Sequence, residues 1–298
     1  MLAAGPVLTW FRDRGETMHG FALVFVVAMA SRLVSMGFLL VHHEPRGPTP
    51  LEEPPWKAVA RVLREPSHRR LIRYLSTMNF SVYLSSPFFT AYMLRMPERH
   101  GLAWPYATFT LVTAISVGSK YVFLPLWGKA ADRFGSRKCL ALSAWLVCAL
   151  PLIWLFPPEH ASLFLAVIIA SQVWSGFAWA GHELCSFNFV LDTARADERG
   201  SVVAAMNAIN GVMLFAGASV GALLVEAVPA GWNPFLVVFC LSSAARLVTC
   251  FTLLPELKEV RVVEHISYRS LFFRIASLRP QLGAMLRLFA LPTGEEED

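Results

Sequence analysis

The chain has few charged residues and lacks most of the short motifs that mark common soluble enzymes. Charged residues make up 16% of the sequence, against about a quarter in ordinary soluble domains. The sequence contains no phosphate-binding Gly-Lys-Ser/Thr loop, which argues against an ATP-driven pump. It also contains no His-Glu-x-x-His and no acidic pair suited to hydrolysis, and its match to Gly-x-Ser-x-Gly, Gly217-Ala-Ser-Val-Gly221, lies within a long apolar run and not at a turn between a strand and a helix. We therefore expect no enzyme activity, and an intramembrane enzyme built on His182 and Glu183 is the one alternative of that kind.

Metal and redox motifs are missing as well. The five cysteines fall inside or at the edge of long apolar runs, and none of them forms a Cys-x-x-Cys pair. Burial as small apolar residues explains them, so we expect no metal and no cofactor. The net charge of +5 does not require a nucleic-acid partner, because membrane topology explains the basic residues.

Long apolar runs are what the chain does have. The sequence is 55% hydrophobic with a mean hydropathy of +0.50. A helix needs about 20 apolar residues to cross a bilayer, and the runs lack the alternation of barrel strands. The sequence predicts an all-α, polytopic membrane protein with about seven transmembrane helices in the lipid bilayer. The seven runs lie at about 20–42, 72–94, 104–127, 139–156, 161–191, 201–226 and 234–254.

These runs suggest a division of the chain. We expect no signal peptide at the start, because Arg12, Asp13, Arg14 and Glu16 precede the first apolar run and no small-residue cleavage site follows it. The expected parts are an external segment at 1–19, a transmembrane helix at 20–42, a cytoplasmic linker at 43–70, a six-helix bundle at 71–256 and a cytoplasmic tail at 257–298.

The linker and the tail carry further patterns. The prolines at 45–55 predict an extended linker. Residues 266–290 alternate arginines with leucines and predict an amphipathic helix on the inner leaflet, interrupted by Pro280. Residues 295–298 form an acidic end that we expect to be disordered.

Lys and Arg accumulate in alternate loops. They are frequent in 43–70, 128–138, 192–200 and the tail, and rare in the loops between. Because cytoplasmic loops are the basic ones, the N-terminus is predicted outside and the C-terminus inside.

The loop at 128–138 reads Gly-Lys-Ala-Ala-Asp-Arg-Phe-Gly-Ser-Arg-Lys between two apolar runs. It resembles the cytoplasmic loop of the major facilitator superfamily of secondary transporters, roughly G-x-x-x-D-R-x-G-R-K. Gly128, Asp132, Arg133 and Gly135 match this pattern. Ser136 departs from it, and Arg137 with Lys138 carry the charge one place later.

The resemblance implies an architecture and a function. Phe21–Glu44 looks like the sixth helix of a twelve-helix facilitator, and 72–254 looks like helices seven to twelve. Such a chain would move a small organic solute across the inner membrane by alternating access, and nearly all of an N-terminal half would be missing. The alternatives are a truncated gene or a half-transporter that pairs with a partner. A seven-span receptor or retinal protein shares the topology, but the last span has no lysine for a Schiff base.

The loop residues suit a cytoplasmic gate. Gly128 would allow close backbone approach at a helix end, and Gly135 suits a tight turn with positive φ. Asp132 could accept hydrogen bonds from a neighbouring helix N-terminus or pair with Arg133, stabilising one gate conformer. The alternative is that Arg133, Arg137 and the other basic residues only fix topology.

Charged residues inside spans are costly and suggest function. The resemblance places the cavity on the second, third, fifth and sixth spans, which favours Lys120, His182 and Glu183. Glu183 is the candidate proton-coupling carboxylate, with a Lys120–Glu183 pair that forms in one state. The alternatives are a permanent structural ion pair, or a Glu183 that lies close enough to the cytoplasmic end to be hydrated. We expect Arg32 and Arg246 to pair or to extend towards the membrane surface.

Polar and aromatic residues could complete a cavity. Trp174, Trp179, His182 and Ser186 follow one another along the fifth span, the last three on one face. Asn79 with Tyr83, and Asn207 with Asn210, add polar groups from the second and sixth spans. Ordinary helix packing with interhelical hydrogen bonds is the alternative for each. Gly217 and Gly221 predict a close helix contact, with Gly211 further back.

Overall fold

The computed structural model describes residues 4–41, 55–96, 98, 100–156, 161–195, 198–259, 263 and 267–277. Within these residues the regular structure is entirely helical. Six of the described helices, α2 and α6 to α10, are long and apolar enough to cross a membrane. The predicted all-α membrane fold is confirmed. Residues 43–54 of the predicted linker and the acidic end lie outside the described residues, whereas residues 55–70 of the linker are described and mainly helical.

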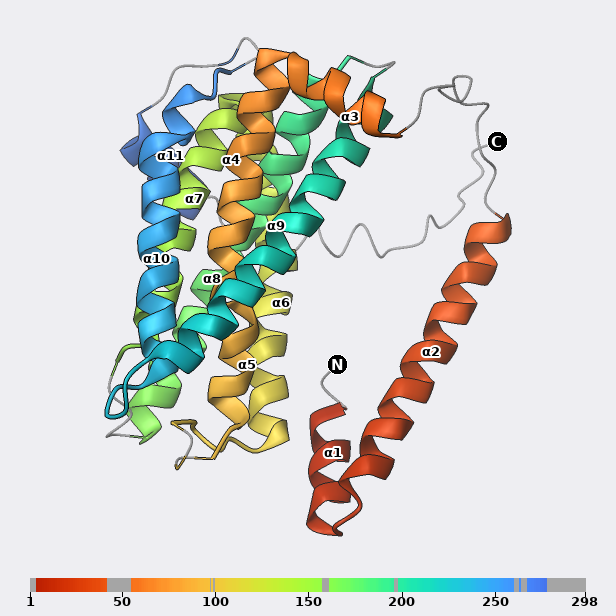
Figure 1. Ribbon diagram of the computed structural model, residues 1–298, viewed down its shortest axis with the longest axis vertical. Coiled ribbons are helices and arrows are strands. Elements are labelled where there is room, and N and C mark those ends of the chain that lie inside the picture. Colours follow the sequence, from red (N-terminus) through yellow and green to blue (C-terminus); the bar gives the residue numbers. More distant parts are fainter. Residues whose placement is uncertain are drawn as a thin grey trace, which may run out of the picture.

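Eleven α-helices are present among the described residues. The helices are α1 (Ala4–Asp13), α2 (Thr17–Val41), α3 (Pro55–Arg64), α4 (Pro66–Tyr83), α5 (Ser86–Leu94), α6 (Tyr106–Phe134), α7 (Ser136–Ile153), α8 (Ala161–Thr193), α9 (Arg199–Ala227), α10 (Pro234–Thr252) and α11 (Tyr268–Ser277). Figure 1 shows that consecutive long helices run up and down the bundle, so that the junctions α6–α7 and α8–α9 share one end.

The predicted span at 72–94 consists of two helices. α4 ends at Tyr83 and α5 begins at Ser86. Pro87 explains the break, because it has no N–H for the carbonyl of Tyr83 and its ring would clash there. The Ser85 hydroxyl oxygen lies 3.3 Å from the carbonyl oxygen of Val82. The break leaves a kinked element in place of one continuous span.

The bundle is held by long helix pairs. α6 packs along α8, α4 along α9, and α10 against α7 and α4. Trp127, Tyr74 and Leu140 are fully buried in its main core. The Trp127 ring lies against Phe177, and its Nε1 donates to the carbonyl of that residue at 2.8 Å. This contact joins α6 to α8 within the main core.

Two glycines allow α9 to approach α4. A Cβ atom on Gly217 would meet the backbone of Phe80, and one on Gly221 would meet the backbone carbonyl of Leu84. The predicted close helix contact is therefore present at Gly217 and Gly221. A Cβ on Gly211 would meet nothing, so this residue does not take part.

α2 stands apart from the bundle, and α1 forms the contact between this hairpin and α6 (Figure 1). The side chains of α2 are largely exposed, including Arg32. Phe21 of α2 contacts Tyr106 of α6 edge to face, with ring centroids 5.9 Å apart.

The tail helix differs from the prediction. We expected an amphipathic helix on the inner leaflet, yet α11 buries Leu271 and Ile275 in the main core. α11 contacts α6 and α7. Leu271 and Ile275 therefore pack on protein at α6 and α7, and residues 278–290 of the predicted amphipathic segment lie outside the described residues.

Candidate functional site

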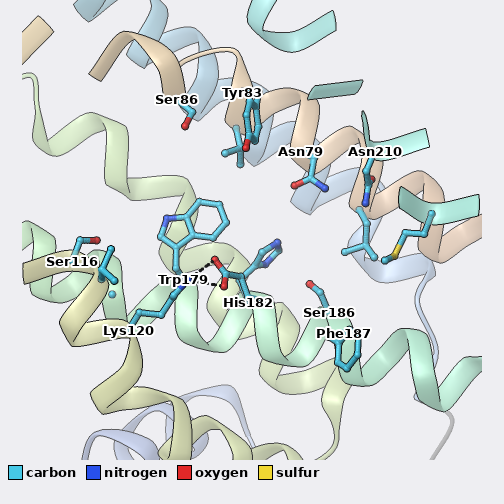
Figure 2. Close-up of a pocket in the computed structure, with 16 residues that line it drawn as sticks. Asn79, Tyr83, Ser86, Ser116, Lys120, Trp179, His182, Ser186, Phe187 and Asn210 are labelled. Carbon is cyan, nitrogen blue, oxygen red and sulfur yellow. Dashed lines mark hydrogen bonds and ion pairs between the residues drawn. The ribbon is translucent and has the colours of Figure 1, made fainter. Parts of the chain in front are cut away.

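A cavity of about 490 Å³ opens between four elements of the bundle. Its walls come from α4 with the start of α5, from α6, α8 and α9, the four spans that the resemblance indicated. Seven of the eight predicted cavity residues line it: Asn79, Tyr83, Lys120, Trp179, His182, Glu183 and Asn210. Figure 2 shows Asn79, Tyr83 and Asn210 on one side of the cavity and Trp179 and His182 on the other.

An ion pair crosses the cavity wall from α6 to α8. Lys120 Nζ donates to Glu183 Oε2 at 2.9 Å and to Oε1 at 3.2 Å, drawn dashed in Figure 2. The side chains are 27% and 53% exposed, so both remain open to the cavity. α6 and α8 come close enough for this pair because Gly176 lies directly against the backbone of Lys120. The expected contact is present, and its part in coupling stays a prediction.

His182 and Ser186 offer polar atoms without partners. His182 is buried and its ring lies edge to face on Trp179, with centroids 5.6 Å apart. Among the described residues, neither His182 Nδ1 nor Ser186 Oγ has a hydrogen-bond partner. Buried polar groups are normally paired. A solute in the cavity could supply these two bonds.

The opposite wall is formed by α4 and α9. The Ser76 hydroxyl donates to Asn210 Oδ1 at 2.9 Å, which fixes the asparagine at the cavity edge. Asn207 was expected here too, but it is exposed on α9 outside the cavity. α9 packs on α4 through Gly217 and Gly221, and this register turns Asn207 away. Trp174 also lies elsewhere, against Phe177 and Phe272.

A second cavity of about 300 Å³ adjoins the first. The two share wall residues, among them Ser86, Ser116 and Trp179. Sequence reasoning missed Ser86 and Ser116. Ser116 could have been found, because it lies one helical turn before Lys120 on the same face.

Arg246 of α10 lines the second cavity and corrects an expectation. It neither pairs with an acid in the described chain nor extends to the surface, and its side chain is buried. Its Nη1 donates to the carbonyl of Val147 at 3.0 Å, and its Nη2 donates to Ser85 Oγ at 3.1 Å.

The predicted gate residues gather where α6 meets α7. Gly128 lies inside α6, not at a helix end, because the helix continues to Phe134. Gly135 alone separates the two helices. Its φ is 92°, in agreement with the positive φ predicted for a tight turn. Asp132 is exposed and has no hydrogen-bond or ion-pair partner among the described residues, so the expected pairing is absent.

Two other acids, Glu259 and Asp192, accept hydrogen bonds at the N-terminus of α7. The backbone N–H of Arg137 donates to Glu259 Oε2 at 2.9 Å, and the Ser136 hydroxyl donates to Asp192 Oδ2 at 3.1 Å. Arg137 Nε donates to the carbonyl of Leu257 at 2.9 Å. A carboxylate at a helix N-terminus is favourable. Glu259 thus takes the place that sequence reasoning gave to Asp132.

The sequence was compared with known families. The family model of the Major Facilitator Superfamily matches residues 80–292, most of the bundle and the tail. The chain belongs to this superfamily. It is an integral, multi-pass membrane protein that acts in membrane transport, since the superfamily consists of transporters that bind small-molecule solutes within the membrane. No curated protein and no solved structure matches the chain.

Proposed function

We propose that this chain moves a small organic solute across a membrane by alternating access and that Glu183 couples the movement to protons. The observation that carries the proposal is the cavity between α4, α6, α8 and α9, with its ion pair and its unpartnered polar atoms. A volume of about 490 Å³ is typical of small-molecule sites.

The coupling mechanism follows from the Lys120–Glu183 contact. While the pair is formed, both oxygens of the Glu183 carboxylate accept hydrogen bonds from the Lys120 ammonium. When α6 and α8 separate, the carboxyl group loses this partner and can take up a proton. Protonation would then be linked to one conformer of the bundle, which is the condition for coupled transport.

The exposure of Glu183 favours the presence of further protein that covers this side of the cavity. Its side chain is 53% exposed although it lies within a membrane-crossing helix. A carboxylate facing lipid is costly. We therefore propose that the transporting unit contains a second six-helix half that covers this side. The basic ends of the helices would face the cytoplasm of a cell with the protein in its inner membrane.

A chain that does not transport by itself remains the second candidate, and the half-exposed Glu183 is the observation that favours it. The test is uptake into sealed vesicles that contain the protein, with a panel of labelled organic solutes and an imposed pH gradient. Flux that depends on the gradient and is lost in Asn79→Ala supports the proposal. Asn207→Ala is the matched control, because that asparagine lies outside the cavity. Equal flux in empty vesicles would overturn transport by this chain.

A further inference from the structure

Arg246 is a buried cation without a counter-ion in the described structure. Its side chain is 2% exposed. Its guanidinium donates hydrogen bonds to two neutral oxygens, of Val147 and Ser85, and Nε has no partner among the described residues. A guanidinium carries five N–H donors. A buried charge is costly unless it is paired, and an anion bound to Arg246 would offset this cost.

Arg246 lines the second cavity, so an anion bound to its guanidinium would lie there. Besides Arg246, the described lining holds neutral polar groups such as Thr113, Gln172 and Ser175, and none of the lining residues is acidic. In the first cavity the charges of Lys120 and Glu183 balance each other. The two adjoining cavities therefore carry one uncompensated positive charge, at Arg246.

The apolar part of the lining indicates an organic anion. Phe89, Phe109 and Trp154 face this cavity together with Met93 and Leu150. Phe89 and Trp154 are in contact, with ring centroids 5.4 Å apart. Such rings would cover the hydrocarbon part of a solute while the guanidinium binds its charged group.

We infer that the second cavity is a subsite for the carboxylate of an organic acid, with Arg246 as its anchor. The inference rests on the proposed function, since it names the class of solute that the transporter would carry. The guanidinium would bind the carboxylate through N–H groups that the protein leaves free, and the aromatic wall would hold the apolar body. The Lys120–Glu183 pair lies in the adjoining part of the same space.

A structural role is the competing explanation, because Arg246 joins α10 to α7 and to the α4–α5 break. Ser85 extends this link by donating to Ser242 Oγ at 2.9 Å. A clamp of this kind would affect folding and would show no preference for charged ligands. The test therefore compares matched ligands that differ in charge.

The experiment measures ligand binding to the full chain in detergent by tryptophan fluorescence, since Trp154 and Trp179 line the cavity. The probes are acetate, hexanoate and benzoate, each with its neutral amide, at constant ionic strength. We expect saturable binding of at least one carboxylate and roughly ten- to a hundredfold weaker binding of its amide, because a charge-assisted hydrogen bond is lost. No carboxylate-specific binding, or equal competition by chloride, would overturn the inference.

Three variants assign the effect to this site. Arg246→Lys should retain the preference for the carboxylate, and Arg246→Gln should lose it. If Arg246→Gln does not fold, as judged by thermal unfolding, Gln172→Glu gives the answer, because it places a negative charge in the cavity and leaves Arg246 intact. Gln172→Met is its neutral control. Unchanged carboxylate binding in Gln172→Glu would contradict the subsite.

The outcome separates the two proposals. Binding needs no transport cycle, so a chain that binds benzoate but moves no solute refutes the proposed transport and supports the subsite. A chain that transports neutral solutes, and shows no carboxylate preference, refutes the subsite alone.

Discussion

Lys120 of α6 and Glu183 of α8 form an ion pair with an Nζ–Oε2 distance of 2.9 Å inside the cavity of the bundle. The pair joins the two helices at the point where Gly176 brings them together. Relative movement of α6 and α8 must break or stretch this contact. The pair is therefore the part of the cavity that can link a conformational change to charge.

A charge swap tests whether the pair acts as a unit. Lys120→Glu and Glu183→Lys each place two like charges in contact, so each alone should abolish uptake. The double variant restores opposite charges and should recover part of the activity. The coupling free energy should be about 1 kcal/mol in stability, because both side chains are partly exposed. No recovery in either uptake or thermal unfolding would show that the pair does not act as a unit.

Removal of the Glu183 carboxylate tests proton coupling. Glu183→Gln cannot release a proton, so flux driven by a pH gradient should be lost while exchange of solute for solute continues. Glu226→Gln is the matched control, since Glu226 lies on α9 and is exposed outside the cavity. Normal gradient-driven flux in Glu183→Gln would exclude this residue as the coupling group.

Substitutions can distinguish the roles of Glu259 and Asp132 at the α6–α7 junction. Glu259→Gln weakens the carboxylate contact at the N-terminus of α7 and should destabilise the protein by about 0.5–2 kcal/mol, as loss of a helix cap does. Asp132→Asn should leave stability unchanged, because Asp132 is exposed. A loss of transport in stable Asp132→Asn would favour a gate role in a conformer other than this one. If Asp132→Asn is the variant that unfolds and Glu259→Gln is not, the assignment at the junction is wrong.

The contact between α4 and α9 should not tolerate larger side chains. Gly217→Val forces a side chain into the backbone of Phe80 and should cost about 1–3 kcal/mol or more by overpacking. Gly211→Val is the control on the same helix, where a Cβ meets no neighbour. Thermal unfolding in detergent measures both variants. Equal midpoints for the two would contradict the close packing at Gly217.

The sequence predicted what depends on local pattern. The apolar runs located the spans, and the family resemblance favoured Lys120 and Glu183 among the intramembrane charges before any contact was known. Gly135 followed from its place between two helices. Each of these features is determined by residues within one segment, or by the high cost of charge in lipid.

Features that depend on the packing of distant segments were missed. The burial of Leu271 depends on the ends of α6 and α7, and the exposure of Asn207 depends on the register of α9 against α4. Arg246 could be placed only once α7 and Ser85 were known to surround it. The break before Pro87 is different, since a proline inside an apolar run gave a local signal that the prediction of one span did not use.

Ser116→Cys provides the most direct measurement of alternating access, because residue 116 lines both cavities. The exposed Cys240 is first replaced by serine, and the other four cysteines are buried. A membrane-impermeant maleimide is then applied to sealed vesicles from one side and, separately, from the other. Ser143→Cys, fully buried in α7, is the control that should not react. The account predicts labelling of residue 116 from both sides, whereas labelling from one side only would contradict it.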